Sequence, residues 1–382
     1  MHASASAMSD IALRSVELRE VALPLVRPFR TSFGEDTEKR CLLLRVDAGD
    51  VTGWGECVAD VEPRYGDEWN DGARISLARF LIPSVLAGGP ISDPAQVGER
   101  VRWVRGHRMA KAALEMAVLD AWLRANETSL AAHAGAVRER VPCGVSVGIA
   151  STVEVMLEEI RGYLAKGYRR VKLKIEPGRD LDVVRRVRDE LPETPLSVDA
   201  NAAYSPADTP LFQALDELGL VMIEQPLGHD DLTDHARLQA RLRTPVCLDE
   251  SIRSAHDAVA AIEMGACRII NIKPGRVGGL LEAKRVHDAA RERDVPVWIG
   301  GMLETGIGRA TNLAMAALPG VTMPGDTSAS ERYFLEDLTT PFVLDSAGTM
   351  AVPSGPGIGV VPLPERLAAC SSAIQLVRTA AE

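Results

Sequence analysis

Five ionisable residues recur along the middle of the chain at a nearly constant interval. They are Lys174, Asp199, Glu224, Asp249 and Lys273, separated by steps of 25, 25, 25 and 24 residues. Each lies at or near the end of an apolar, strand-like run. The interval matches one strand-plus-helix unit, and parallel strands in register bring their carboxyl ends to one rim of a sheet. The spacing therefore predicts three carboxylates grouped between two lysines.

The three carboxylates, Asp199, Glu224 and Asp249, form a candidate metal site. Carboxylates within a few ångströms of one another repel unless a cation neutralises them. Ligation by oxygen alone favours a hard divalent ion such as Mg²⁺. A carboxylate after a strand can instead cap the next helix. Capping does not account for three carboxylates at a constant interval between lysines, so we predict a metal site.

The run VKLKI carries two lysines on one side of a strand. Lys172 and Lys174 alternate with Val171, Leu173 and Ile175, whose apolar side chains suit a helix-packed face. We therefore expect both amines to face the interior of a barrel. Two neighbouring buried cations should lower each other's pKa and give a neutral amine that can take a proton near pH 7.

Lysines beside a metal site suggest proton abstraction from carbon. The carbon next to a carboxylate is a very weak acid, so its deprotonation needs stabilisation of the enediolate as it forms. A metal ion supplies that stabilisation and a lysine takes the proton. Lys273 follows Lys174 by four strands of eight, which would place one lysine on each face of the substrate. Glu304, on the seventh strand, could position a lysine or the substrate, or cap a helix.

The elements that would position these residues alternate regularly from Pro142 onwards. Seven helical patterns alternate with eight apolar strand candidates, the last of them near VTMPGD. Strands that are apolar throughout are buried on both faces, as parallel strands covered by helices must be. An open doubly wound sheet would alternate in the same way. Functional residues at successive strand ends favour a closed barrel, which we assign to residues 136–330.

The flanking segments follow other patterns. Residues 11–135 predict a three-stranded antiparallel meander followed by helices at 71–86 and 109–124, which together make an α+β module. Residues 331–382 are rich in Pro and Gly but apolar, so we expect them to pack back on that module. Residues 1–10 lack a sustained apolar stretch and are interpreted as a disordered leader, not a signal peptide.

Composition excludes several classes of partner. Charged residues make up 25% and hydrophobic residues 46% of the 382, and the net charge is −10. No basic surface for nucleic acid is expected. The chain also lacks the run of about 20 apolar residues that would span a bilayer. Six cysteines without a Cys-x-x-Cys pair suggest free thiols in a reducing compartment. We expect a cytoplasmic, homo-oligomeric enzyme that acts on a small-molecule carboxylate.

The motifs resemble a known family along nearly the whole chain. The match is carried by VPCGVSVGI, VKLKIEPG, VDAN, IEQPL, CLDESI, NIKPGRVGG, GGMLETGIGRA and PGDTSAS, and by the N-terminal PLVRPFRTSFG, GWGECV and GHRMAKAALEMAVLDA. These strings resemble the muconate-lactonizing subgroup of the enolase superfamily, within it the o-succinylbenzoate synthase / N-acylamino acid racemase family.

The resemblance implies a fold and a set of roles. It implies a modified TIM barrel, (β/α)₇β, with an N-terminal α+β capping domain and a site for Mg²⁺, with Mn²⁺ or another divalent ion as a substitute. Lys174 would be the base of the dehydration, with its pKa lowered by Lys172. Lys273 would stabilise the enediolate or act on the opposite face in racemisation. The implied substrate-binding residues are Asn201, Ser146, Phe29, Arg27, Ser32 and Glu304, of which Arg27, Phe29 and Ser32 lie in a loop that closes over the substrate.

Several activities fit these residues. The first hypothesis is a lyase that dehydrates a 2-succinyl-cyclohexadiene carboxylate to o-succinylbenzoate in menaquinone synthesis, and that also racemises N-acylamino acids such as N-succinylamino acids. A dipeptide epimerase or a cycloisomerase would use the same barrel. A Schiff-base aldolase acting through Lys174 or Lys273 is a mechanistically distinct alternative. A metal-stabilised binding or scaffold protein is the non-enzymatic one.

Overall fold

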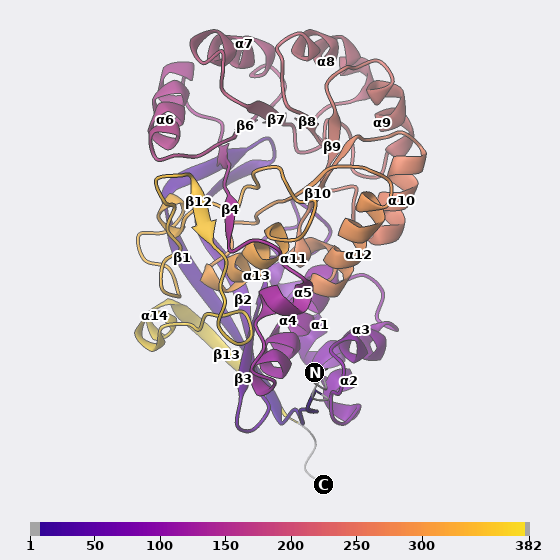
Figure 1. Ribbon diagram of the computed structural model, residues 1–382, viewed down its shortest axis with the longest axis vertical. Helices are drawn as coiled ribbons and strands as arrows, with labels where there is room; N and C mark the ends of the chain where they lie inside the picture. The colour runs from indigo at the N-terminus through magenta and orange to yellow at the C-terminus, as the bar shows by residue number, and fades with distance from the viewer. Residues whose placement is uncertain (1–7, 379–382) are drawn as a thin grey trace, which may run out of the picture.

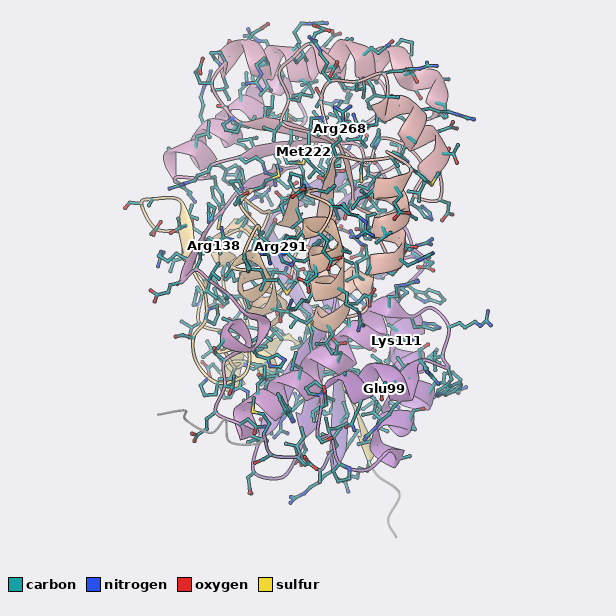
Figure 2. All side chains as sticks on the ribbon, turned by 45° about the vertical axis from the view of Figure 1, so that its right-hand side comes forward. Glu99, Lys111, Arg138, Met222, Arg268 and Arg291 are labelled. Carbon is teal, nitrogen blue, oxygen red and sulfur yellow. The ribbon has the colours of Figure 1, made fainter. Side chains whose placement is uncertain are left out.

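The computed structural model describes residues 8–378 as two packed halves. The barrel half lies above the N-terminal domain in Figure 1, and the C-terminal segment runs along one side of both. Side chains fill the space between the ribbons in both halves (Figure 2), and one continuous apolar core includes residues from each. The predicted leader lies largely outside the described residues. At its end, the Ser9 backbone N–H donates to Asn126 Oδ1 at 2.6 Å.

Seven parallel strands form the sheet of the barrel half. Every residue of these strands is buried, as their apolar sequences predict. The strands follow one another in the order β5 to β11. Their bounds are β5 (Val145–Val147), β6 (Val171–Lys174), β7 (Leu196–Asp199), β8 (Ile223–Glu224), β9 (Val246–Leu248), β10 (Ile269–Ile272) and β11 (Val297–Ile299).

A helix follows each of these strands and covers the outside of the sheet (Figure 1). The helices are α6 (Val153–Ala165), α7 (Leu181–Glu190), α8 (Thr209–Asp216) after a 3₁₀ turn η2 (Pro206–Asp208), α9 (Leu232–Gln239), α10 (Ala255–Glu263), the short α11 (Pro274–Val277), α12 (Leu280–Arg291) and α13 (Gly306–Ala316). Several begin at a Ser, Thr or Asp whose side chain accepts a hydrogen bond from the first turn, as Thr152, Ser254 and Thr305 do. This alternation confirms the predicted barrel class.

The eighth predicted strand, near VTMPGD, is not a strand in the structure. Two hydrogen bonds join this segment to the residue before β5 and to the end of β11 instead. Gly144 N–H donates to Gly325 O at 2.7 Å, and Asp326 N–H donates to Ile299 O at 3.3 Å. Pro324 has no N–H to donate, and a Cβ at Gly325 would lie 2.3 Å from the Ile299 carbonyl oxygen. The pairing is limited to one parallel bridge between Cys143 and Gly325.

The N-terminal domain contains the predicted antiparallel meander with one strand added from the far end of the chain. Its sheet has the order β13-β1-β2-β3, so the C-terminal strand pairs with the first. A Cβ at Gly53 or Gly55 would lie 2.1 Å from a carbonyl oxygen of helix α4, so only glycine lets α4 lie this close to β3. The strands are β1 (Ser15–Thr31), β2 (Gly34–Asp47), β3 (Thr52–Cys57) and β13 (Ser371–Arg378).

The predicted helix at 71–86 is interrupted by a π-helical segment. The helices of this domain are α1 (Asn70–Ser76), the π segment η1 (Leu77–Leu81), α2 (Ile82–Ala87), α3 (Ala95–Val101), α4 (Arg108–Ala125) and α5 (Leu130–Ala134). The remaining elements link the two halves: β4 (Arg140–Pro142) pairs with β12 (Thr349–Ala351), and η3 (Ser330–Arg332) and α14 (Pro364–Cys370) lie in the C-terminal part. Within the described residues, no helix has the length and apolar character to cross a membrane.

Two buried glutamates of the N-terminal domain hold the first turns of barrel helices. Glu56 accepts hydrogen bonds from the backbone N–H of Thr305 at 3.0 Å and of Gly308 at 2.9 Å, at the start of α13. Glu115 accepts one from Leu281 N–H at 3.0 Å, at the start of α12. A negative charge is favourable at a helix N-terminus. Burial nevertheless dominates and raises the pKa of both carboxyls to about 7.

Replacing Glu115 with Gln should change how stability depends on pH. Because the folded-state pKa of Glu115 is about 7, the stability linked to its proton is present below the unfolded pKa, and it is lost as the pH rises through 7. The neutral isostere removes that loss. Urea titrations measure the free energy of unfolding of both proteins at pH 5 and pH 8. We expect the difference between Glu115→Gln and the wild type to shift by about 2 kcal/mol in favour of Glu115→Gln from pH 5 to pH 8. The exposed Glu99→Gln is the control. Parallel curves for wild type and Glu115→Gln would contradict the assignment.

Candidate active site

The five periodic residues meet at one rim of the sheet. Lys174 pairs in register with Asp199, and Asp199 with Glu224, across β6, β7 and β8. Asp249 and Lys273 directly follow β9 and β10. All five side chains are buried. The structure therefore brings together the residues that the spacing grouped.

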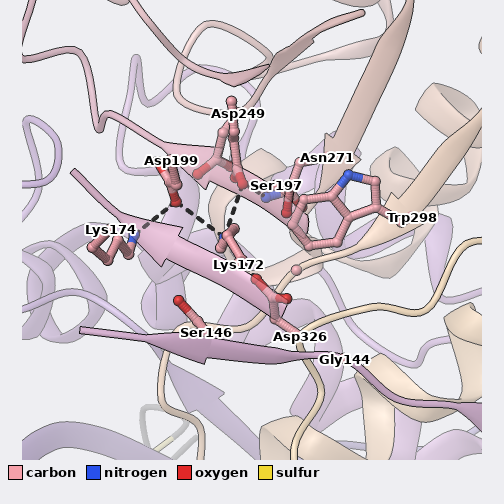
Figure 3. Close-up of polar contacts among 12 residues, drawn as sticks. Gly144, Ser146, Lys172, Lys174, Ser197, Asp199, Asp249, Asn271, Trp298 and Asp326 are labelled. Atoms are coloured by element: carbon pink, nitrogen blue, oxygen red, sulfur yellow. Dashed lines mark hydrogen bonds and ion pairs between the residues drawn. The ribbon is translucent and has the colours of Figure 1, made fainter. Parts of the chain in front are cut away.

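The two lysines of β6 face the interior of the barrel and contact its carboxylates (Figure 3). Lys174 Nζ lies 2.7 Å from Asp199 Oδ2 and 2.6 Å from Asn201 Oδ1. Lys172 Nζ lies 3.0 Å from Asp199 Oδ2 and 2.9 Å from Glu224 Oε2. Asp199 thus accepts from both ammonium groups, and its pKa is lowered because their charges outweigh the effect of burial.

Lys273 lies on the other side of the carboxylate group. Its Nζ donates to Asp249 Oδ2 at 2.8 Å and to the Tyr65 hydroxyl at 3.0 Å. The Tyr65 hydroxyl in turn donates to Asp249 Oδ2 at 3.2 Å. Arg276 forms an ion pair with the other oxygen of Asp249, and its Nη2 donates to Asn271 O at 2.9 Å. Asp249 is therefore shared by two cations and a phenol.

The three lysines differ in how their surroundings shift their pKa. For Lys174, burial and the neighbouring Lys172 lower the pKa despite Asp199. For Lys172, burial opposes the charge, but Asp199, Asp326 and Glu224 raise the pKa well above its usual value. Burial also opposes the charge of Lys273, and Tyr65 with Glu250 raises its pKa. The expectation that Lys172 and Lys174 lower each other's pKa is thus wrong for Lys172, because three carboxylates surround its ammonium group.

The carboxylates have the chemistry of a site for a hard divalent ion. Glu224 Oε1 accepts from Asn271 Nδ2 at 2.8 Å, and the buried Oε2 forms an ion pair with Lys172 Nζ at 2.9 Å. Among residues 8–378, no three His, Cys, Asp or Glu side chains stand at metal-ligand spacing. Asp199, Glu224 and Asp249 are instead turned towards ammonium and guanidinium groups. Three carboxylates from adjacent strand ends offer only oxygen donors, which suits a hard divalent ion such as Mg²⁺.

A cavity lies over the lysines. The tip of the β1–β2 hairpin covers it, and Arg30 ties that tip to Glu176 at 3.0 Å. Three predicted substrate-binding residues, Phe29, Ser146 and Asn201, line the cavity. Its other lining residues are Thr31, Phe33, Asp36, Asp60, Tyr65, Lys172, Lys174, Lys273, Gly301, Met302, Leu303, Asp326 and Tyr333.

The other three predicted substrate-binding residues are not part of the cavity wall. Arg27 is exposed and pairs with Glu159 of α6 at 2.8 Å. Ser32 donates from its hydroxyl to Ala200 O at 3.2 Å. Glu304 is buried and accepts hydrogen bonds from Met302 N–H and Asn312 Nδ2. Arg27 and Ser32 thus fasten the hairpin to the barrel, and Glu304 shapes the loop after β11.

Sequence reasoning missed Tyr65, Arg276 and Asp326. Arg276 follows Lys273 by three residues in NIKPGRVGG, and the single turn of α11 returns its guanidinium to Asp249, so a helical interpretation of that string would have found it. Tyr65 lies in an irregular loop of the N-terminal domain, 184 residues from Asp249. Asp326 follows a strand that does not form. Neither lies in a periodic pattern.

Comparisons with known proteins agree on the family. Residues 13–135 match the N-terminal domain of the mandelate racemase / muconate lactonizing enzyme family, and residues 155–366 match the enolase C-terminal domain-like family. The chain is 55% identical to an N-succinylamino acid racemase of Amycolatopsis sp. over 93% of its length and 96% of that protein. It is 50% identical to an o-succinylbenzoate synthase of Geobacillus kaustophilus over 91% of its length and 93% of that protein.

Solved structures extend the likeness to the fold. An enolase superfamily member from Listeria innocua superposes with a TM-score of 0.92 at 40% identity, over 96% of this chain and 99% of that one. A muconate lactonizing enzyme from Pseudomonas fluorescens superposes with a TM-score of 0.89 at 26% identity, over 95% and 100%. The chain belongs to the enolase superfamily, in the muconate-lactonizing group that contains the o-succinylbenzoate synthases and N-succinylamino acid racemases.

Proposed function

We propose that this protein is a divalent-metal-dependent o-succinylbenzoate synthase that also racemises N-succinylamino acids. The observation that carries the proposal is the placement of Lys174 and Lys273 on opposite sides of the buried carboxylates Asp199, Glu224 and Asp249. The names of relatives at 55% and 50% identity support both activities. The enzyme would serve menaquinone synthesis as a cytoplasmic homo-oligomer.

Asp199, Glu224 and Asp249 would hold the ion, and Mg²⁺ suits their oxygen donors. When bound, it supplies positive charge to the substrate carboxylate as the α-carbon loses its proton. The chain's own cations would rearrange around it, since Lys172, Lys174, Lys273 and Arg276 now contact these carboxylates. The enzyme family sets the requirement for a divalent ion, and our choice of Mg²⁺ rests on ligand chemistry.

Lys174 and Lys273 have different tasks because their charges differ. Burial and Lys172 lower the pKa of Lys174, which favours the neutral amine that accepts the α-proton at Nζ. Lys273 keeps its charge, held by Tyr65 and Asp249, and stabilises the enediolate oxygen. In dehydration, the C–H and C–O bonds of the substrate break and water leaves. In racemisation, Lys273 returns a proton to the opposite face.

The residues of the cavity wall would determine which substrate side chain the enzyme accepts. Its apolar part consists of Phe29, Phe33, Met302, Leu303 and Tyr333. Ser146 Oγ is buried there without a hydrogen-bond partner, so it can serve a polar group of the substrate. Asn201 orients Lys174 by accepting from its Nζ. A dipeptide epimerase or cycloisomerase would share the lysines and differ in this wall, so parallel assays with their substrates separate them.

Each lysine should be required for racemisation. In D₂O the wild type should exchange the α-hydrogen of N-succinylamino acids and interconvert the enantiomers. Lys174→Ala and Lys273→Ala should each lower the rate of interconversion at least about 10³-fold, because one face then lacks its proton carrier. Chiral chromatography and NMR follow the two readouts. The exposed Lys166→Ala is the control. Racemisation that survives the loss of either lysine would refute the two-face assignment.

Metal removal should abolish activity and lower thermal stability. Chelation with EDTA should stop o-succinylbenzoate formation, and Mg²⁺ should restore it and raise the Tm by roughly 3–6 °C at saturation. Glu224→Gln should lose this response, whereas Glu115→Gln, a buried carboxyl outside the site, should keep it.

The same treatment tests the Schiff-base alternative, which the lowered pKa of Lys174 keeps open. An aldolase would turn over fully after chelation, and borohydride would trap its substrate on a lysine. Either result would overturn the metal-dependent mechanism.

A further inference from the structure

A buried chain of charges lies beneath the rim, where Lys172 is enclosed by three carboxylates (Figure 3). Its Nζ lies 2.6 Å from Asp326 Oδ2, 2.9 Å from Glu224 Oε2 and 3.0 Å from Asp199 Oδ2. The shortest contact is therefore with Asp326, which is not one of the five periodic residues.

Arg170 fixes the carboxylate of Asp326. Its Nη2 donates to Asp326 Oδ1 at 2.8 Å, and its Nε donates to Pro324 O at 2.8 Å. The guanidinium is fully buried and lies 4.4 Å from the centre of the Trp298 ring. One oxygen of Asp326 thus faces Arg170 and the other faces Lys172. The backbone adds to this, because Asp326 N–H donates to Ile299 O.

Two of the three carboxylates around Lys172 are the metal ligands of the proposed function. An ammonium group and a divalent ion compete for the oxygens of Asp199 and Glu224. A buried ammonium group that loses its counter-ions is strongly disfavoured. Asp326 is the carboxylate contact of Lys172 that the metal does not need.

We propose that Asp326, held by Arg170, is a positioning residue that acts through Lys172. It keeps the ammonium group of Lys172 at the inner side of the rim and so leaves Asp199 and Glu224 available to a divalent ion. The inference rests on the metal-binding part of the proposed function and is independent of which substrate is turned over.

Mn²⁺ binding to the full-length protein without substrate tests this role. Asp326→Asn removes the charge and keeps the shape, and Asp326→Ser is a second neutral variant should the first not fold. We expect Mn²⁺ to bind at least about 10-fold more weakly to the neutral variant, as found for residues that orient metal ligands. Asp326→Glu should bind more tightly than Asp326→Asn. Asp337→Asn is the matched control, since Asp337 is buried in the same part of the chain and accepts from Gly306 N–H and Ser330 Oγ.

Repeating the Asp326 substitution in a protein that lacks the Lys172 ammonium group separates positioning from a general effect of charge. If Asp326 acts through Lys172, the neutral substitution should change Mn²⁺ affinity less than about threefold in a Lys172→Met protein, because the competing ammonium group is absent. An equal loss of affinity in both backgrounds would overturn the inference, and so would wild-type affinity in Asp326→Asn. Failure of the proposed function looks different: the wild type would bind Mn²⁺ and form no o-succinylbenzoate.

Discussion

Buried positive charge is the constraint on which the active site depends. Lys172, Lys174 and Lys273 all lie inside the barrel, where an ammonium group without a counter-ion is strongly disfavoured. Each is satisfied by a carboxylate from a neighbouring strand end. The same carboxylates are the candidate ligands of a divalent ion, so lysines and metal share one set of oxygens. The chemistry of the site depends on which carboxylate oxygens bind the lysines and which remain for the metal ion.

The N-terminal domain contributes side chains to the active site as well as covering it. Tyr65 crosses from that domain to bridge Lys273 and Asp249, and its ring lies 4.6 Å from Lys273 Nζ. Glu56 and Glu115 hold the first turns of α13 and α12 from the same side. These contacts fix the domain against the barrel at the cost of burying two carboxylates. The position of the proton carrier on one face therefore depends on contacts between the domains.

Periodicity made most of the barrel predictable. Strands β6 to β10 end at, or one residue before, the residues that the 25-residue interval selected, because a strand covered on both faces must be apolar up to its end. The prediction of an eighth strand was wrong for a local reason: Pro324 has no N–H to donate, and the pairing is limited to one bridge between Cys143 and Gly325. The fourth strand of the other sheet, β13, begins 356 residues after the start of β1, and nothing in the local sequence signals this pairing.

The amino-acid sequence by itself determined the strand ends, the grouping of three carboxylates and the lysine pair of β6, since these depend on local patterns that repeat. Only the tertiary structure decided which counter-ion each lysine has. Lys172 and Lys174 are two residues apart on one strand, yet the pKa of one is raised and that of the other is lowered. Asp199 and Glu224 raise the pKa of both lysines, whereas Asp326, which long-range folding brings to 2.6 Å from Lys172 Nζ, raises that of Lys172. Electrostatic interaction depends on distance in space, and residue spacing does not encode it.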